Sequence, residues 1–121
     1  MNELKIKRIY LPKEEDDGYR ILIDRLWPRG ISKTKAALDE HCTVIAPTAG
    51  IRKAFGHKEE NYGVFADDYR NELNNNNDAI VFAEHCMKLL ADDNVTLLYG
   101  AKSETCNHAI ILRDWIMSQW K

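Results

Sequence analysis

The sequence has 121 residues, a length that supports one hydrophobic core but not two, so we expect a single domain over residues 1–121. Hydrophobic residues make up 45% of the chain and charged residues 30%, a balance that excludes an intrinsically disordered protein. The formal net charge of −2 argues against a broad basic surface, so binding to nucleic acid is not expected and an anion must be bound at a local site.

The expected compartment follows from signals that the sequence lacks. Its apolar runs are far shorter than the roughly 20 residues that a membrane span needs, and residues 1–5 lack the basic-then-apolar layout of a signal peptide. The three cysteines, Cys42, Cys86 and Cys106, are widely spaced and form no C-x-x-C pair, which argues against a disulfide framework and a structural zinc site. We therefore expect a cytoplasmic protein with reduced thiols, no membrane contact, and no metal or cofactor.

The first part of the chain predicts two strands. Residues 4–10 are rich in β-branched side chains, and residues 19–27 contain an apolar run at 21–23 that is typical of a central strand covered on both faces. The acidic segment 13–18 ends in glycine and predicts a surface turn. Because this connection is too short for a usual parallel crossover, we expect the two strands to be antiparallel neighbours or not adjacent.

The middle of the chain predicts short helices joined by connectors. Ser32 is a typical cap for one short helix, and Thr48 begins another that ends at Gly56. Between them, residues 43–46 have the composition of a brief strand. The four asparagines at 74–77 predict a connector between two helices, because asparagine caps helices and tolerates left-handed backbone.

Apolar side chains at helical spacing predict two further helices. One face carries Tyr62, Phe65, Tyr69 and Leu73, and the next helix repeats the pattern with Ile80, Ala83, Met87 and Leu90. Residues 95–99 predict a buried strand parallel to 19–27, followed by a loop and a final helix from about Cys106. The final helix is apolar around most of its circumference, which predicts deep packing or a homodimer contact.

These elements predict an α/β fold, with a small mixed, mainly parallel sheet of three to four strands flanked by about five helices. Ligands in such sheets bind beyond the carboxyl ends of the strands. Arg25 and Arg29 follow one predicted strand, and Tyr99, Asn107 and His108 follow the other. If these strands are adjacent and parallel, the two groups share a pocket.

The two arginines predict a site for phosphate or carboxylate, because a guanidinium binds either group at two points. The alternative is structural: Arg25 pairs with Asp24 or Asp39, and Arg29 fixes a loop. Trp27 fits packing as well as an aromatic cover over a ligand.

Two histidines are candidates for acid–base or orienting roles. His57 lies just beyond a predicted helix end, where it can carry a proton or interact with the carboxyl end of that helix. His108 lies at a helix start, where the helix dipole favours the neutral ring, so it can orient a ligand or serve a structural hydrogen bond. The side chains of His41 and Cys42 point apart in a strand, which argues against a metal site there.

Other chemistry-bearing side chains have simpler interpretations. Cys106 at a helix start leaves a reactive thiol as a lesser hypothesis. Arg70 and Glu72 most simply form a solvated helix face, and Tyr62 and Tyr69 belong to a buried helical stripe.

The run Asp17–Gly30, DGYRILIDRLWPRG, resembles the YeaO-like family, a group of bacterial proteins with a domain of unknown function. The similarity continues in Ala46-Pro47-Thr48, Ile51-Arg52-Lys53, Phe55-Gly56-His57, Tyr69-Arg70, Val95–Tyr99 and Asn107-His108-Ala109. The resemblance implies a small cytoplasmic α/β protein whose motif residues include Arg52, and it brings no established reaction or cofactor. The family usually has tryptophan near 41 and 54, where this chain has His41 and Ala54.

Two main hypotheses follow. The first is an enzyme-like pocket for a small anionic ligand, with Arg25, Arg29 and Arg52 binding the anion and His57 or His108 in acid–base roles. Hydrolysis or group transfer is then favoured over redox chemistry, because no dinucleotide glycine fingerprint is present. The second is a non-enzymatic regulatory or interaction protein, with the basic segment 5–8 as a contact for nucleic acid or a partner.

Overall fold

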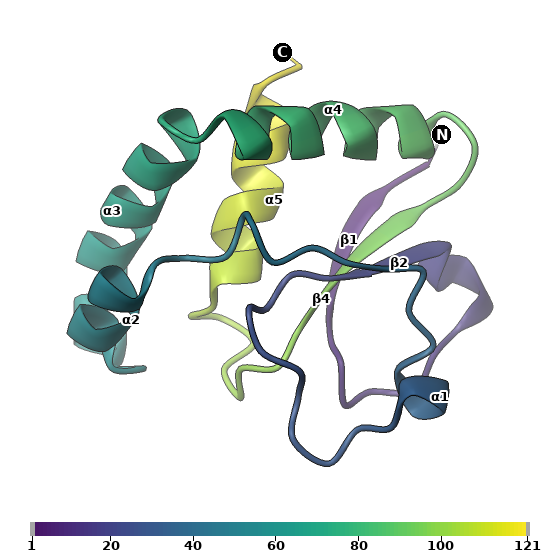
Figure 1. Cartoon of the computed structure of the whole chain (residues 1–121), viewed down its shortest axis with the longest axis horizontal. Helices are drawn as coiled ribbons and strands as arrows, with labels where there is room; N and C mark the ends of the chain where they lie inside the picture. Colours follow the sequence, from purple (N-terminus) through teal and green to yellow (C-terminus); the bar gives the residue numbers. More distant parts are fainter. Residues whose placement is uncertain (1, 121) are drawn as a thin grey trace.

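The computed structural model describes residues 2–120. The strands are β1 (Leu4–Arg8), β2 (Tyr19–Leu22), β3 (Glu40–His41) and β4 (Val95–Tyr99). The helices are α1 (Lys33–Ala36), α2 (Ala49–Phe55), α3 (Tyr62–Asn74), α4 (Asn77–Leu90) and α5 (His108–Ser118), with short 3₁₀ turns η1 (Glu15–Asp17) and η2 (Glu59–Asn61). Figure 1 shows the strands crossing near the centre, with α2 and α3 at one end of the molecule.

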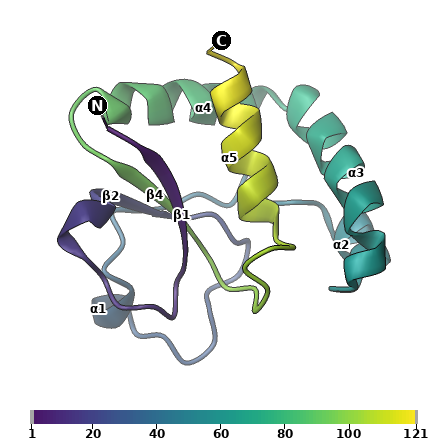
Figure 2. The same ribbon diagram turned by 180° about the vertical axis from the view of Figure 1, so that it is seen from behind.

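The sheet has the strand order β1-β4-β2-β3, and all three strand pairs are parallel. The predicted α/β fold with a mainly parallel sheet of up to four strands and about five helices is therefore confirmed. We expected β1 and β2 to be either antiparallel neighbours or not adjacent. The second alternative is confirmed, because β4 lies between them. β4 thus has a strand on each side, and all five of its residues are buried. Seen from behind, β1 and α5 lie nearest the viewer (Figure 2).

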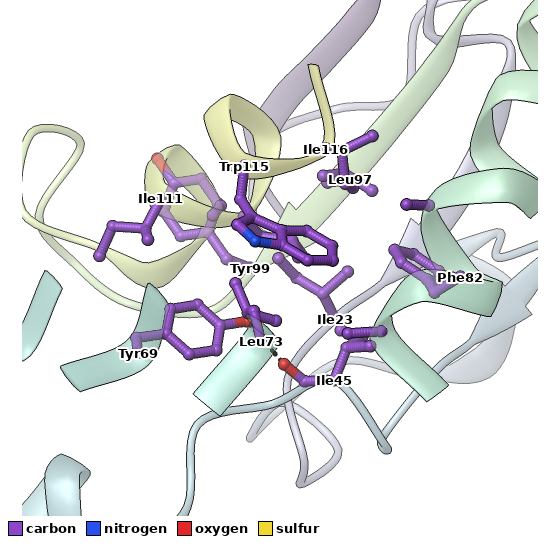
Figure 3. Close-up of a cluster of buried hydrophobic side chains, with 14 of the residues drawn as sticks. Ile23, Ile45, Tyr69, Leu73, Phe82, Leu97, Tyr99, Ile111, Trp115 and Ile116 are labelled. Atoms are coloured by element: carbon purple, nitrogen blue, oxygen red, sulfur yellow. Dashed lines mark hydrogen bonds between the residues drawn. The ribbon is translucent and has the colours of Figure 1, made fainter. Parts of the chain in front are cut away.

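The larger hydrophobic core covers one face of the sheet. Every second side chain of the central strands points into it, including Ile21, Leu97 and Tyr99. Trp115 and Ile116 of α5 pack on these strands, which confirms the deep packing predicted for the last helix (Figure 3). A smaller cluster on the opposite face is formed by Ile9, Leu22, Ile31, Ala36 and Leu98.

An ion cluster on that opposite face joins η1 to β1 and β2. We use this name for Asp17, Arg20 and Lys7: Asp17 Oδ2 pairs with Arg20 Nη1 at 2.5 Å, and Asp17 Oδ1 pairs with Lys7 Nζ at 2.7 Å. Arg20 also donates to the carbonyls of Ala36 and Ala37. The segment 13–18 is thus a turn as predicted, but its carboxylate Asp17 is fully buried.

Two predicted strands have different bounds in the structure. Residues 43–46 form a turn, and the short strand β3 precedes them at Glu40–His41. β2 ends at Leu22, although the prediction extended it to Trp27. The backbone leaves the sheet there, because Asp24 turns its side chain to the Gly100 N–H and Pro28 cannot continue a ladder.

The helices begin and end largely where their capping residues predict. Ser32 accepts a hydrogen bond from Lys35 N, and Gly56 ends α2 in left-handed backbone at φ 56°. The asparagine tract separates α3 from α4, with the Asn76 side chain capping α4.

The predicted face of α3 is buried. In α4, Ala83 is buried as predicted, but the rest of the buried stripe lies about one residue before the predicted one. In α4 the buried residues are Ala79, Phe82, Ala83 and Cys86. Ile80 is 43% exposed, because apolar residues flank both sides of the true stripe and blur its period. None of the helices among residues 2–120 is long and apolar enough to cross a membrane.

Candidate functional site

A cavity of about 500 Å³ lies at the carboxyl ends of β2 and β4. Its walls come from the loop after β2, from α2 with the loop before it, and from the loop after β4 with the start of α5. The two strands are adjacent and parallel, with Leu22 in register with Leu98, so their carboxyl ends open at the same edge. This arrangement matches the usual position of ligand sites in parallel sheets.

Asp24 and His108 form the polar wall of the cavity. Asp24 Oδ2 accepts a hydrogen bond from the Gly100 N–H at 2.8 Å, which ties the loop after β2 to the end of β4. His108 Nε2 lies 3.3 Å from the Ile23 carbonyl oxygen and 3.4 Å from Asp24 Oδ1. Burial lowers the pKa of His108 below its usual 6.5 and outweighs the opposite effect of the Asp24 carboxylate.

The loop that carries Asp24 is held by β3 and by its own tryptophan. His41 Nε2 lies 2.7 Å from the Asp24 carbonyl oxygen, and Trp27 Nε1 donates to the Ile31 carbonyl at 2.6 Å. The rings of Trp27 and His41 meet edge-on, with centroids 5.9 Å apart. His41 therefore helps to position the loop that carries Asp24.

The start of α5 is fixed by hydrogen bonds from three directions. Asn107 Oδ1 accepts from Ile110 N at 3.1 Å, and its Nδ2 donates to the Ser103 carbonyl at 2.9 Å. Tyr62 Oη of α3 donates to the Asn107 carbonyl at 2.7 Å. Asn107 is therefore the capping residue that sets the direction of His108, and its side-chain amide is already used within the fold.

Three cationic side chains line the cavity: Arg25, Arg52 and Lys53. Arg52 Nε donates to the Pro47 carbonyl at 3.1 Å. None of the three forms an ion pair within 4.0 Å among the ion pairs of residues 2–120. The cavity thus gathers three cations around one carboxylate, Asp24.

Glu72 fixes the start of α2 and is not a purely solvated residue. Its Oε1 accepts from Thr48 N at 3.1 Å, and its Oε2 accepts from the Thr48 hydroxyl. The carboxylate takes the place of a side-chain cap at the helix start, so it orients the helix that carries Arg52 and Lys53. Arg70 pairs with Asp67 on the exposed side of α3, as a solvated face would.

The structure brings together five of the seven residues that were predicted to form the site. Arg25, Arg52, His57, Asn107 and His108 line the cavity. His57 is exposed, has left-handed backbone at φ 57°, and lies at the cavity rim with its ring 5.6 Å from that of Phe55.

Arg29 and Tyr99 do not line the cavity. Arg29 is exposed beyond the buried Pro28, and its backbone carbonyl accepts from the Tyr10 hydroxyl at 3.0 Å. Tyr99 is only 3% exposed, because strand alternation turns its ring into the core (Figure 3). Lys53 and Gly100 were not predicted, although Lys53 adjoins Arg52 on the same short helix.

A group of three acidic side chains outside the cavity has the spacing of metal ligands but is paired with lysines. The carboxylates of Glu14, Asp16 and Asp17 lie within 4.8 Å of one another. Lys7 Nζ pairs with Glu14 at 2.9 Å and with Asp17, and Lys5 Nζ pairs with Asp16 at 3.0 Å, so lysines neutralise this group.

All three cysteines carry free thiols. Burial raises the pKa of Cys86 to about 12 and also raises that of Cys42. Cys106 is half-buried and lines the cavity.

Comparison with known proteins gives the family. A family model described as the inactive DUF488-N3 subclade matches residues 3–121. The chain belongs to this family. The uncharacterised protein YeaO of Escherichia coli (strain K12) is 46% identical over 121 residues, covering 95% of this chain and 97% of the relative.

The uncharacterised protein Rv3073c of Mycobacterium tuberculosis (strain H37Rv) is 32% identical over 109 residues, covering 90% of this chain and 89% of the relative. No solved structure matches the chain. The predicted membership in the YeaO-like group of unknown function is thus confirmed.

Proposed function

We propose that this protein binds a small anionic ligand, one that bears phosphate or carboxylate, in the cavity at the carboxyl ends of β2 and β4. The observation that carries the proposal is the gathering of Arg25, Arg52 and Lys53 around the cavity, with no ion pair to an acidic residue within residues 2–120. Three cations left close together repel one another, and an anion relieves that repulsion. Arginine forks add two-point hydrogen bonding to phosphate or carboxylate.

The remaining walls fit an organic body attached to the anion. Phe55, Phe65 and Pro47 line the side of the cavity next to the cations, and the rings of Phe55 and Phe65 stack at 4.5 Å between centroids. A mostly apolar cavity with a few convergent polar groups is the usual form of a small-molecule site. We therefore favour an organic phosphate, or a carboxylic acid with a carbon skeleton, over a bare inorganic ion as the natural ligand.

We propose that the ligand is held without being transformed. The description of the family as an inactive subclade supports binding without turnover, and so does the geometry of Asp24 and Asn107. Asp24 is tied to Gly100 N, and both polar atoms of the Asn107 side chain are used within the fold. A regulatory protein that responds to its bound ligand fits these features better than an enzyme does.

The test is a ligand panel against the parent and matched variants. Purified protein is titrated with inorganic phosphate, sugar phosphates, nucleotides and small carboxylic acids, and thermal unfolding and calorimetry report binding. A ligand at about 100 times its Kd stabilises the fold by roughly 2.7 kcal/mol, which raises Tm by several degrees. Arg52→Gln is expected to weaken binding at least tenfold, since charged hydrogen bonds contribute about 1.5–3 kcal/mol.

The matched control is Arg113→Gln, which removes an arginine that pairs with Asp114 on the surface of α5, away from the cavity lining. This variant should bind as the parent does. If every member of the panel leaves the parent unshifted, or if Arg52→Gln and Arg113→Gln bind equally, the cavity is not an anion site.

A further inference from the structure

Only one of the two ring nitrogens of His108 forms a hydrogen bond within residues 2–120. Nε2 lies 3.3 Å from the Ile23 carbonyl oxygen, an atom that only accepts hydrogen bonds. Nε2 must therefore carry the hydrogen, whichever charge state the ring adopts. Nδ1 forms no hydrogen bond with residues 2–120. Within these residues, Asp24 Oδ1 is the one buried side-chain nitrogen or oxygen that lacks a partner, so Nδ1 must be accessible to solvent. His108 lines the cavity, so this accessible Nδ1 is the ring nitrogen that a ligand bound there can use.

The orientation of this ring is enforced from several sides. Tyr69 presents its ring edge-on to His108, with centroids 6.1 Å apart, and donates its own hydroxyl to the Ile45 carbonyl at 2.6 Å. Asp24 cannot swing away from Nε2, because Gly100 N holds its other oxygen. Burial keeps the ring neutral near pH 7 by lowering its pKa. A neutral ring with hydrogen on Nε2 presents a lone pair, and so a hydrogen-bond acceptor, at Nδ1.

This acceptor lies in a cavity whose cationic side chains can only donate. Arg25, Arg52 and Lys53 supply N–H groups to the oxygens of an anion. An oxygen without hydrogen that approaches His108 Nδ1 instead places two lone pairs face to face. When a bound anion covers Nδ1 without offering it a donor, the cost is of the same order as a lost hydrogen bond.

We propose that His108 Nδ1 makes the cavity selective for oxyanions that carry a hydrogen-bond donor, such as hydrogen phosphate or a hydroxy acid, over anions that carry none. This inference rests on the proposed anion binding and specifies the class of ligand. We expect anions with a donor to bind with about tenfold higher affinity than anions without one. This is the effect of forming one hydrogen bond to Nδ1 instead of leaving it unpaired. His108 then serves as a specificity residue, in contact with the ligand, rather than as a catalytic one.

The experiment compares two anions of nearly equal size and shape. Near pH 8, phosphate is mostly HPO₄²⁻ with one O–H, whereas sulfate is SO₄²⁻ with none. Calorimetric titration of the parent should give phosphate affinity about tenfold above sulfate affinity. In His108→Gln, the amide can still donate to Ile23 but nothing replaces Nδ1, so the two affinities should become equal, mainly through loss of phosphate binding.

A spectroscopic readout on the parent removes the dependence on a variant that has to fold. The ¹⁵N spectrum of the histidine rings should show His108 Nδ1 as an unprotonated nitrogen without ligand. Saturating phosphate should shift that signal toward lower frequency, and sulfate should leave it nearly unchanged.

The outcomes separate this inference from the proposed function. Equal affinity of the parent for the two anions, or a Nδ1 signal that phosphate does not move, overturns the role of His108 while anion binding stands. Absence of binding by both anions and by the whole ligand panel overturns both proposals. A preference for phosphate that persists unchanged in folded His108→Gln overturns the selectivity mechanism alone.

Discussion

The ion cluster and the cavity use the same kinds of charged residue in opposite ways. In the ion cluster, Asp17 accepts from Lys7, Arg20 and the Glu14 backbone, and the remaining Arg20 donors reach backbone carbonyls. At the cavity, Asp24 Oδ1 has no hydrogen-bond partner, and three cations lack acidic partners among the described ion pairs. Charged groups that are fully paired within the protein stabilise the fold, whereas unpaired charges around a cavity are available to bind a ligand.

The pKa directions express the same contrast. Burial alone raises the pKa of Asp17, but hydrogen bonds from Lys7, the Glu14 backbone and Arg20 outweigh it and hold the pKa below its usual 3.8. Burial alone lowers the pKa of Lys7, but bonds to Asp17 and Glu14 hold it above 10.5. Both groups are therefore charged in the native state, whereas His108 is kept neutral.

The largest expected effect comes from breaking the ion cluster. Arg20→Met leaves Asp17 buried with one cation fewer and frees the carbonyls of Ala36 and Ala37, so we expect a loss of about 3–5 kcal/mol in the free energy of unfolding. Urea denaturation measures it. Arg70→Met, which removes an exposed ion pair on α3, is the matched control and should cost at most about 1 kcal/mol. Equal losses in the two variants would show that the ion cluster does not stabilise the fold.

A smaller effect is expected from crowding the cavity wall. A Cβ at Gly100 would lie 2.9 Å from Asp24 Oδ2, so Gly100→Ala must displace the Asp24 carboxylate and weaken its bond to the backbone. We expect a loss of about 1–2 kcal/mol in stability and a changed ¹⁵N signal of His108. Gly50→Ala is the control, because nothing lies within 4 Å of its added Cβ. An unchanged His108 signal in Gly100→Ala would mean that Asp24 does not orient the ring.

The smallest effect is a pH dependence that belongs to His108. Its pKa is lowered in the folded state, so the unfolded chain binds more protons between that pKa and 6.5. The parent should therefore lose stability as the pH falls through 6.5, and this component should be absent in His108→Gln. The charged and titratable groups that face the ring are Asp24, Arg52 and Tyr69, and all three are kept in the variant.

Urea denaturation of the parent and His108→Gln at several pH values between 7.5 and 5 measures this component. If the parent instead gains stability relative to His108→Gln as the pH falls, the ring is charged in the native state and Nδ1 is not a neutral acceptor.

Local signals made most elements predictable. The mostly apolar run of β4, the Ser32 cap and the Gly56 helix end are properties of neighbouring residues, and the structure confirms each of them. The location of the cavity was also predictable, since parallel strands place Asp24 and His108 at one edge. The face of α4 was not, because Ile80 and Val81 flank the buried stripe with exposed apolar side chains.

The misplaced side chains depend on contacts between distant residues. Asp17 appears in the sequence as one of four consecutive acidic residues. Its burial depends on the ion pair with Lys7 of β1, which the local sequence does not reveal. Arg29 follows Arg25 closely in the chain, but the buried Pro28 separates its surroundings from those of the cavity. Glu72 shows no sign in the sequence that it reaches Thr48, 24 residues earlier. In each case the missing information is which element lies opposite.

The position of β4 in the middle of the sheet has a consequence for how the protein comes to be folded. Its partners β1 and β2 have no hydrogen bonds to each other in the sheet order, and β4 reaches them only after residue 94 has been made, pairing Val95 with Leu4. During synthesis, β1 and β2 therefore have no β4 to pair with until most of the chain has been made. Contacts so distant in sequence slow folding. Chains that stop before β4 should aggregate or be degraded rather than persist as folded fragments.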